Sequence, residues 1–314
     1  MRTLERMEPS VVDKRWVTTR YGEIAYLETG PSGKPPVLFV HGIPTSSFLW
    51  RHVIDLLAAD VHCYAPDLLG LGDTEVSVDA DVFHMDAQAE MLVDFMTTLG
   101  HERFGLVCHD QGGAAAQIIA ARHPERVASF VLTNCVCYDN WPVPVIRRLQ
   151  KLSKLPLLSE LMTRSGLSER LETSMRWSSF RRGVYHPNAL TNEAIREYLR
   201  PMRTSRRGRE RFRAFLLAGE PEYTMAAVDG LRKFAAPTLV VWAADDRFLS
   251  PSWGRQLADD IPGCDRFELV PFCGHFWQEE KPREFAALIG PFLAASMPCE
   301  DADDHPVRLP VLVH

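Results

Sequence analysis

The sequence predicts an α/β fold in which a mostly parallel sheet is flanked by helices. Short, continuous apolar segments such as PVLFV and FGLVC alternate with helical patterns at 47–59, 83–99 and 111–122. Strands that are apolar throughout are buried on both faces, as in parallel sheets covered by helices. The 314 residues, 46% of them hydrophobic, suffice to bury one large core of this kind.

An antiparallel pair precedes this alternation, and an insertion interrupts it. Residues 14–29 alternate polar and apolar positions around Tyr21 and Gly22, which predicts a hairpin with one solvated face. No strand pattern occurs between Asn134 and residue 237, so we expect an insertion there. The expected strands lie at 36–40, 61–67, 104–110, 126–134, 237–243 and 265–271, with a closing helix at 282–295.

The insertion is basic, with 18 Lys and Arg and nine Asp and Glu over 141–232, although the whole chain has a net charge of -6. Its Arg-rich stretch 201–213 could guide anionic substrates, but a solvated helix face is the simpler interpretation. We therefore predict a helical cap inserted into an α/β core. The predicted divisions are 1–137 and 233–297 for the core, 138–232 for the cap and 298–314 for a C-terminal tail.

The overall composition is that of a globular protein. The net charge of -6 disfavours a dedicated nucleic-acid binder, and no apolar run reaches the roughly 18 residues that a membrane span needs. Residues 1–15 lack an apolar signal core, so we expect a cytoplasmic protein. The seven cysteines form no CxxC pair and are expected to be buried free thiols.

A turn between a strand and a helix carries the first candidate for chemistry. The segment FGLVCH runs into Asp110, Gln111 and two glycines, and then into an apolar helix. Glycines allow a sharp turn that lifts one side chain above the sheet, as in a nucleophile elbow, and the lifted residue here is Asp110. The structural alternative for this aspartate is a helix N-cap.

Two loops that follow later strands supply partners for Asp110. Asp246 follows the strand at 237–243, and His275 follows the last strand beside a glycine. The order nucleophile, acid, histidine at the carboxyl ends of parallel strands is that of the α/β-hydrolases. Other positions considered for the acid are Asp245, expected to face the other way, Asp139, and the site after the preceding strand, which is Asn134.

A further motif, His41-Gly42-Ile43-Pro44, follows the strand at 36–40 and offers the N–H of Ile43, with that of Gln111, as an oxyanion hole. With these motifs the chain resembles α/β-hydrolases of the haloalkane dehalogenase and epoxide hydrolase group over about residues 20–295. The motifs that carry this resemblance are HGIPTSSFLWR, APDLLGLGDT, VCHDQGG, ARHPERV, AADDRF and GHFWQEEKP.

The resemblance implies a covalent mechanism on Asp110. A carboxylate, with an ordinary pKa near ~4, is ionised at neutral pH and attacks without a base. Its attack on a saturated carbon gives a stable ester, whereas attack on an acyl group would give a labile anhydride. His275, oriented by Asp246, would then activate the water that hydrolyses the ester. A haloalkane dehalogenase-like reaction is preferred, with epoxide hydrolysis as the alternative.

The group that stabilises the departing atom separates these two reactions. Haloalkane dehalogenases commonly bind halide through a Trp directly after the nucleophile and an Asn after the HG pair, where this chain has Gln111 and Ile43. The Gln111 amide and the indoles of Trp141 and Trp177 are candidate replacements. Epoxide hydrolases use cap tyrosines to protonate the alkoxide, and the candidates here are Tyr138, Tyr185, Tyr198 and Tyr223.

Two alternatives from other classes share the same fold: a cofactor-independent oxygenase and a ligand-binding protein. The complete set of three residues argues against the second. Neither a metal nor an organic cofactor is expected, because the sequence has no HExxH motif and Gly70-Leu71-Gly72 precedes Asp73 rather than forming a dinucleotide fingerprint. The expected partner is a small, apolar substrate, with neither nucleic acid nor membrane involved, and the oligomeric state is left open.

Overall fold

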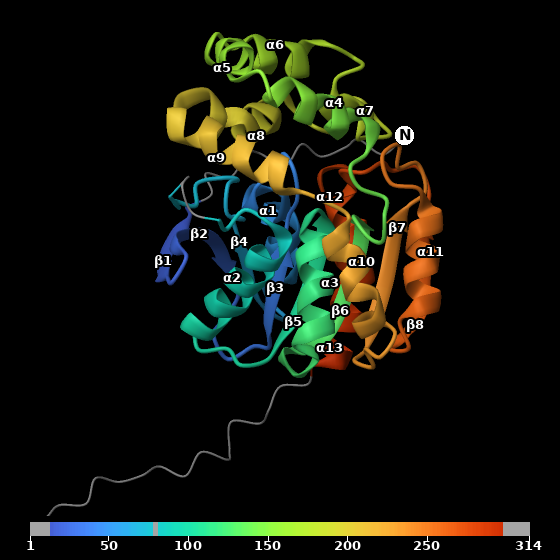
Figure 1. Ribbon diagram of the computed structural model, residues 1–314. Coiled ribbons are helices and arrows are strands. Elements are labelled where there is room, and N and C mark those ends of the chain that lie inside the picture. Colours follow the sequence, from blue (N-terminus) through green and yellow to red (C-terminus); the bar gives the residue numbers. More distant parts are fainter. Residues whose placement is uncertain (1–12, 78–80, 298–314) are drawn as a thin grey trace, which may run out of the picture.

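An eight-stranded sheet with the order β1-β2-β4-β3-β5-β6-β7-β8 organises the computed structural model, which describes residues 13–77 and 81–297. Strand β2 pairs antiparallel with β1 and β4, and the remaining pairs are parallel (Figure 1). The predicted hairpin and mostly parallel sheet are therefore confirmed. The strands are β1 (Arg15–Thr19), β2 (Gly22–Thr29), β3 (Pro36–Val40), β4 (His62–Pro66), β5 (Phe104–Asp110), β6 (Val127–Cys135), β7 (Thr238–Ala243) and β8 (Cys264–Val270).

Helices cover both faces of this sheet, which is why its central strands are apolar throughout. One face packs on α1 (Arg51–Leu57) and α13 (Pro282–Ser296), and the other on α2 (Met85–Thr98) and α3 (Gly112–Arg122). A fifth helix beside the sheet, α11 (Pro251–Asp260), was not predicted; it packs on the core through Leu257, with Trp253 and Ala258 partly buried. Two short helices, η1 (Ser47–Trp50) and η2 (Pro124–Arg126), complete this layer.

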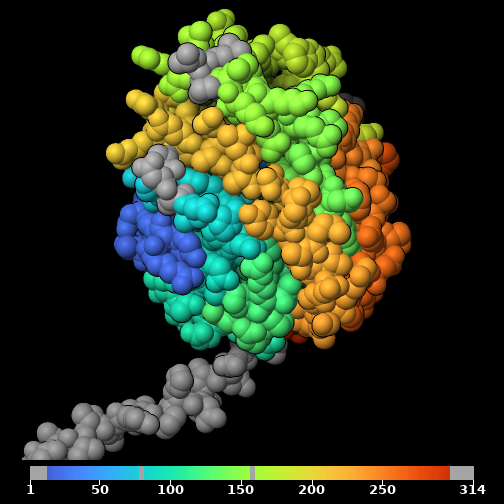
Figure 2. All heavy atoms as spheres, viewed as in Figure 1, coloured from blue at the N-terminus to red at the C-terminus, as the bar shows by residue number. Residues whose placement is uncertain are grey.

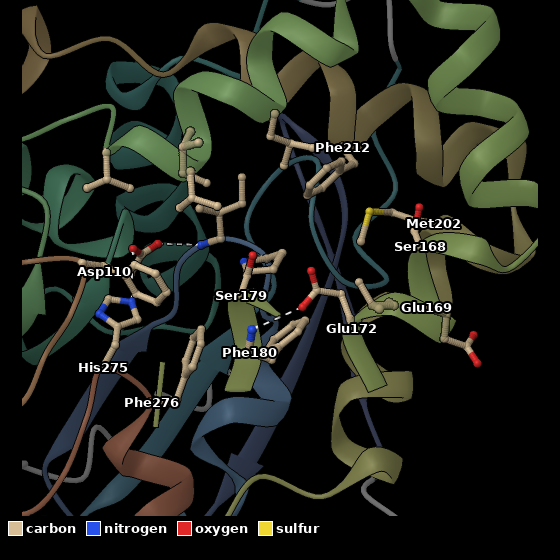
Figure 3. A pocket seen from close by; sticks show the side chains of 18 of the residues that line it. Asp110, Ser168, Glu169, Glu172, Ser179, Phe180, Met202, Phe212, His275 and Phe276 are labelled. Atoms are coloured by element: carbon tan, nitrogen blue, oxygen red, sulfur yellow. Dashed lines mark hydrogen bonds and ion pairs between the residues drawn. The ribbon is translucent and has the colours of Figure 1, made fainter. Parts of the chain in front are cut away.

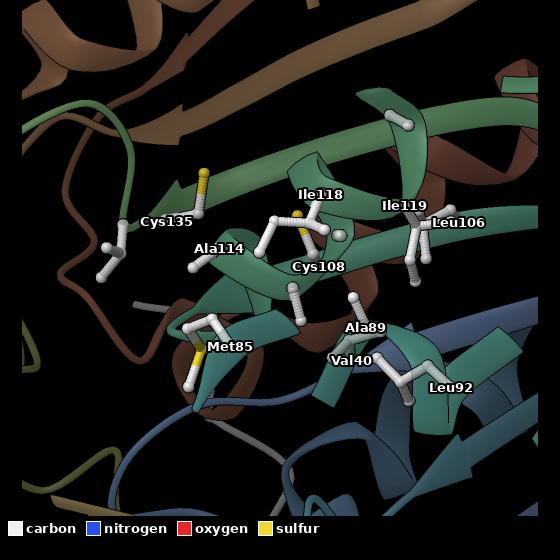
Figure 4. Close-up of a cluster of buried hydrophobic side chains, with 14 of the residues drawn as sticks. Val40, Met85, Ala89, Leu92, Leu106, Cys108, Ala114, Ile118, Ile119 and Cys135 are labelled. Atoms are coloured by element: carbon white, nitrogen blue, oxygen red, sulfur yellow. The ribbon is translucent and has the colours of Figure 1, made fainter. Parts of the chain in front are cut away.

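The core beneath the carboxyl ends of the strands is closely packed. Every residue of β5 is buried, and its side chains pack with those of β3, β6, α2 and α3 (Figure 4). Cys108 and Cys135 belong to this cluster as free thiols, and burial raises the pKa of the Cys135 thiol well above its ordinary value. The expected free thiols are found at the six described cysteines, of which Cys264 is only partly buried. Cys299 and the predicted tail lie outside the described residues.

The segment between β6 and β7 forms helices that lie across the carboxyl ends of the strands (Figures 1 and 2). The last of them, α10 (Glu222–Leu231), returns to the sheet and packs on α3, where a Cβ on Gly230 would lie 2.5 Å from Ala121 Cβ. The division into core and cap remains a prediction, since α10 belongs by packing to the core. The other helices are α4 (Pro144–Ser153), α5 (Pro156–Arg164), α6 (Leu167–Ser174), α7 (Ser179–Arg182), α8 (Asn192–Thr204) and α9 (Arg206–Ala218).

The Arg-rich stretch 201–213 spans the end of α8 and most of α9, and only part of it is a solvated face. Arg206 is highly exposed and pairs with Glu210 one turn away. Arg209 is mostly buried and holds α9 to α5 through Glu160, at 2.6 Å. The stretch therefore contributes packing between helices as well as surface charge.

A buried ion pair between α1 and α12 (Trp277–Glu280) also holds helix α8 of the insertion. The Arg51 guanidinium contacts both carboxylate oxygens of Glu279 on α12, at 2.6 and 2.8 Å, and both side chains are almost fully buried. The hydroxyl of Tyr198 on α8 donates to the same carboxylate. Burial alone would lower the pKa of Arg51, but Glu279 raises it above its ordinary value.

Among the described residues, no helix is long and apolar enough to cross a membrane.

We predict that Glu279→Gln lowers the free energy of unfolding by about 3–5 kcal/mol, because it leaves the Arg51 charge buried without its counterion. Urea denaturation followed by circular dichroism measures this loss. The matched control is Glu284→Gln on the exposed Lys281–Glu284 pair, which we expect to change stability by less than about 1 kcal/mol. Equal small losses in both variants would contradict a stabilising role for the buried pair.

Candidate functional site

Asp110 stands at a sharp turn between β5 and α3, with a φ of 51° in the left-handed region. Three glycines allow the backbones around it to approach closely. A Cβ on Gly112 would lie 2.3 Å from the His41 carbonyl oxygen, and one on Gly42 would lie 2.2 Å from Asp110 Oδ1. A Cβ on Gly113 would likewise collide with Cys135. The turn thus presents Asp110 above the carboxyl end of the sheet, as the sequence predicts for a nucleophile elbow.

The loop after β3 supplies a hydrogen bond to Asp110. The backbone N–H of Ile43 donates to Asp110 Oδ1 at 2.7 Å. The second predicted donor, Gln111 N–H, lies near the same place, since a Cβ on Gly42 would come within 2.6 Å of its nitrogen and 2.2 Å of Asp110 Oδ1. The two N–H groups that the sequence predicts as an oxyanion hole therefore flank the same side chain.

His41 fixes this loop without facing the pocket. Its Nε2 accepts from Leu68 N–H at 3.0 Å, and its Nδ1 donates to the Gly42 carbonyl oxygen at 3.1 Å. Complete burial lowers the pKa of His41 to about 4, so the ring is neutral at pH 7 and can both donate and accept.

His275 lies between two carboxylates. Its Nε2 is 3.4 Å from Asp110 Oδ2, and its Nδ1 is 2.8 Å from Asp246 Oδ2. Burial alone would lower the pKa of His275, but the carboxylates of Asp246 and Asp110 raise it to about 10. The imidazole is therefore a cation as long as both neighbours are charged.

The position of His275 is held by a second buried histidine. His109, the residue before Asp110, donates from Nε2 to the His275 carbonyl oxygen at 2.9 Å. Burial and the nearby His275 lower the pKa of His109 to about 3, which keeps it neutral. Sequence reasoning missed both His41 and His109, although a polar residue at the end of an apolar strand was the available signal.

Asp246 is buried and fully hydrogen-bonded. Its Oδ1 accepts from the N–H groups of Phe248 and Leu249, at 2.7 and 3.0 Å, and its Oδ2 accepts from Asn134 Nδ2 at 2.7 Å. Burial would raise the pKa of Asp246, but His275 and these donors lower it below its ordinary value. Asp246 is therefore a carboxylate with its orientation fixed.

The other positions considered for the acid do not face His275. The carboxylate of Asp245 accepts from Phe272 N–H at 3.0 Å, on the far side of the loop, and Asp139 is exposed. Asn134 lies beside Asp246 and supports it through its amide. The geometry thus favours Asp246 among the four.

Asp110 and His275 open into a cavity of about 180 Å³ beneath the helices inserted between β6 and β7 (Figure 3). Its walls near these two residues are apolar, with Ile43, Phe248 and Phe276 among them. A second cavity adjoins it and shares the lining residues Leu149, Thr163, Ser168, Met202 and Phe212. Within the described part of the chain, no group of His, Cys, Asp or Glu could hold a metal ion.

Of the three candidate donors to a departing group, Gln111 and Trp141 lie close to each other beside Gly219, and Trp177 lies apart from them. Trp177 has 68% of its surface exposed and does not line the cavity, so the structure does not bring it to Asp110. Trp141 lines the cavity, and its indole N–H donates to the Gly219 carbonyl oxygen at 3.2 Å. A Cβ on Gly219 would lie 2.7 Å from Gln111 Nε2 and 2.8 Å from Trp141 Nε1, so both nitrogens meet beside this glycine.

None of the four candidate tyrosines lines the cavity next to Asp110. The Tyr138 hydroxyl donates to Asp260 at 2.9 Å, and that of Tyr198 donates to Glu279. Tyr223 stacks on the ring of His84, and Tyr185 packs against Phe272. These four side chains therefore point away from Asp110. Their partners Asp260, Glu279, His84 and Phe272 all lie outside the insertion, and these long-range contacts determine the directions of the tyrosines.

Comparisons with known proteins agree with this architecture. A haloalkane dehalogenase 2 of Mycobacterium bovis is 28% identical over 282 residues, covering 88% of this chain and 93% of that protein. A soluble epoxide hydrolase of a Corynebacterium species is also 28% identical, covering 81% of this chain and 88% of its own. The crystal structure of a haloalkane dehalogenase from Bradyrhizobium elkani superimposes with a TM-score of 0.73 at 26% identity, covering 90% of this chain and 98% of its own.

A family model described as the alpha/beta hydrolase fold matches residues 35–282, which include Ile43, Asp110, Asp246 and His275. The matched region holds six of the eight strands, β3 to β8, and the whole insertion. The chain therefore belongs to the α/β-hydrolase family.

Proposed function

We propose that this hydrolase forms a covalent alkyl ester on Asp110, most like a haloalkane dehalogenase, and hydrolyses it with a water activated by His275. The observation that carries the proposal is the contact of Asp110 with both Ile43 N–H, at 2.7 Å, and His275 Nε2, at 3.4 Å, in an apolar cavity. The resemblance to a protein named haloalkane dehalogenase 2 supports the same reaction class.

In the first step, an oxygen of the Asp110 carboxylate attacks the saturated carbon that carries the halogen. A carbon–oxygen bond forms, and the carbon–halogen bond breaks with its electron pair leaving as halide. The carboxylate needs no base for this attack. The apolar walls supplied by residues such as Phe248 and Phe276 favour an uncharged alkyl chain and exclude water from the reacting carbon.

The ester then changes the charge around His275. Esterification removes the negative charge of Asp110, which is one of the two carboxylates that raise the pKa of His275. The pKa of His275 falls, and the proton passes to solvent, so the ring becomes a base held in place by Asp246.

In the second step, neutral His275 takes a proton from a water molecule that attacks the carbonyl carbon of the ester. The oxyanion that forms on Asp110 is stabilised by the N–H groups of Ile43 and Gln111. When this intermediate collapses, the alcohol leaves with the proton from His275, and the Asp110 carboxyl passes its remaining proton to His275, which becomes a cation again. The sum is alkyl halide and water going to alcohol, halide and a proton.

Halide release is favoured over epoxide opening by the donors at hand. Trp141 lines the cavity with an indole N–H that donates to the Gly219 carbonyl oxygen at 3.2 Å, and the Gln111 amide nitrogen lies beside the same glycine. N–H groups of both kinds can bind halide. Epoxide opening needs an acid for the alkoxide, and no tyrosine of the described chain lines the cavity. The similarity to a soluble epoxide hydrolase keeps this reaction as the second candidate.

We predict that His275→Gln accumulates the covalent ester, because the variant retains the nucleophile but lacks the base. Intact-mass measurement after incubation with bromoalkanes should show the mass of the alkyl group without bromine. Incubation with epoxides would add the whole epoxide if the second candidate is correct. The control His275→Gln/Asp110→Ala should gain no mass, and an adduct on that variant would place the nucleophile elsewhere.

We predict that Asp110→Asn lowers the pKa of His275 well below about 10, because one of the two neighbouring carboxylates is lost. The imidazole resonances of His275, followed by NMR across pH, report this value. The matched control Asp245→Asn removes a carboxylate that does not face His275 and should leave its titration unchanged. An unchanged titration in Asp110→Asn would contradict the charge switch between the two steps.

We predict that Gln111→Leu slows ester formation from bromoalkanes by roughly 10- to 1,000-fold, because a donor to the departing halide is removed from a site shielded from water. Rapid-mixing kinetics in the His275→Gln background isolate this step. Gln150→Leu is the control, because it removes an amide that donates to the Gly219 carbonyl oxygen at 3.4 Å from outside the Asp110 cavity. Equal rates in the two variants would exclude the Gln111 amide as a halide donor.

A further inference from the structure

The cavity beside Asp110 has one polar wall. Its apolar residues surround Asp110 and His275, whereas α6 and α7 contribute Ser168, Glu172 and Ser179. In Figure 3, Glu172 and Ser168 lie across the cavity from Asp110, with Ser179 between the two sides. A substrate whose carbon reaches Asp110 therefore extends its other end toward these polar side chains.

Glu172 differs from the other acid on this wall. Glu169 lies 3.7 Å from Arg196 and 3.9 Å from Arg203, and its charge is balanced at the rim. Glu172 is half-buried, and within the described chain no Lys or Arg lies within ion-pair distance of it. Its Oε2 accepts from Phe180 N–H at 3.3 Å, and hydrogen bonds from Ser178 and Ser179 also reach this carboxyl group, so its neighbours are uncharged donors.

A carboxyl group in this setting is suited to a neutral, hydroxylated ligand. Burial raises the pKa of Glu172 above its ordinary value, since the charged form loses solvation without gaining a cation. The carboxyl oxygens accept hydrogen bonds, and a hydroxyl group at the end of a substrate is an uncharged donor of the kind that already faces them. A substrate hydroxyl on this wall of the cavity can therefore donate to Glu172 as the two serines do.

We propose that Glu172 is a specificity-determining residue that hydrogen-bonds to a hydroxyl group at the end of the substrate remote from the carbon attacked by Asp110. The inference rests on the proposed function and narrows its substrate class to alkyl chains with the reacting carbon at one end and an alcohol at the other. Glu172 does not act on the departing atom, because it lies across the cavity from Asp110.

The test compares bromoalkanes with bromoalkanols of the same chain length, over a series of lengths. In the wild type, we expect kcat/KM to favour the alkanol by roughly tenfold at the best length, as one well-formed hydrogen bond allows. Glu172→Leu should remove this preference while retaining turnover of the plain bromoalkane. Glu172→Gln, whose amide also donates and accepts, should keep most of it.

The matched control is Glu169→Gln, which changes an acid on the same helix and the same cavity wall. We expect it to alter the alkanol preference by less than about twofold, because Glu169 is already paired with arginines. A wild-type enzyme without a preference, or a preference that persists in Glu172→Leu, overturns the proposal.

A binding measurement separates this proposal from the proposed function. In Asp110→Ala no ester can form, and ligand-observed NMR compares alkanediols with alkanols of equal length. A preference for the diol that disappears in Asp110→Ala/Glu172→Leu supports the role of Glu172 even if no bromoalkane alkylates His275→Gln. Equal binding of diol and alkanol overturns it even if alkylation is observed.

Discussion

The left-handed backbone at Asp110 is the constraint on which the rest of the site depends. A side chain in this conformation is held only where the surroundings fix it, and the fully buried β5 on one side and α3 on the other provide that support. The close approach of Gly112 to the loop after β3 brings Ile43 N–H to the Asp110 carboxylate. One strained turn thus sets both the position of the carboxylate and the donor that faces it.

The charges around His275 determine the order of the two proposed chemical steps. Two carboxylates share one imidazole, and the buried neighbours His41 and His109 are neutral, so they add hydrogen bonds without adding charge. Loss of either negative charge changes the proton affinity of the ring. The proposed order of bond formation and proton transfer therefore follows from electrostatics, and no rearrangement of the backbone is needed for His275 to change its role.

The sheet, the helical insertion and the chemistry of the loops could be predicted from the sequence, whereas the directions of the side chains in the insertion could not. Continuous apolar strands and an Asp before two glycines are local signals, and Asp246 and His275 follow strands directly. The direction of Tyr198 depends on Glu279, which is 81 residues away, and no local pattern reveals this. Glu172 was missed for a similar reason: Ser168 and Glu172 share a helical face by their spacing, but only the tertiary arrangement turns that face toward Asp110.

Asn134 gives the sheet a second position for the acid. Its amide nitrogen and His275 Nδ1 both contact the same oxygen of Asp246, and its amide oxygen accepts from Ala243 N–H at 3.0 Å. An aspartate at 134 facing an asparagine at 246 would retain this pair of side chains beside the imidazole with the charge exchanged. The acid can therefore migrate between neighbouring strands during evolution by two substitutions, while the histidine and the backbone stay where they are.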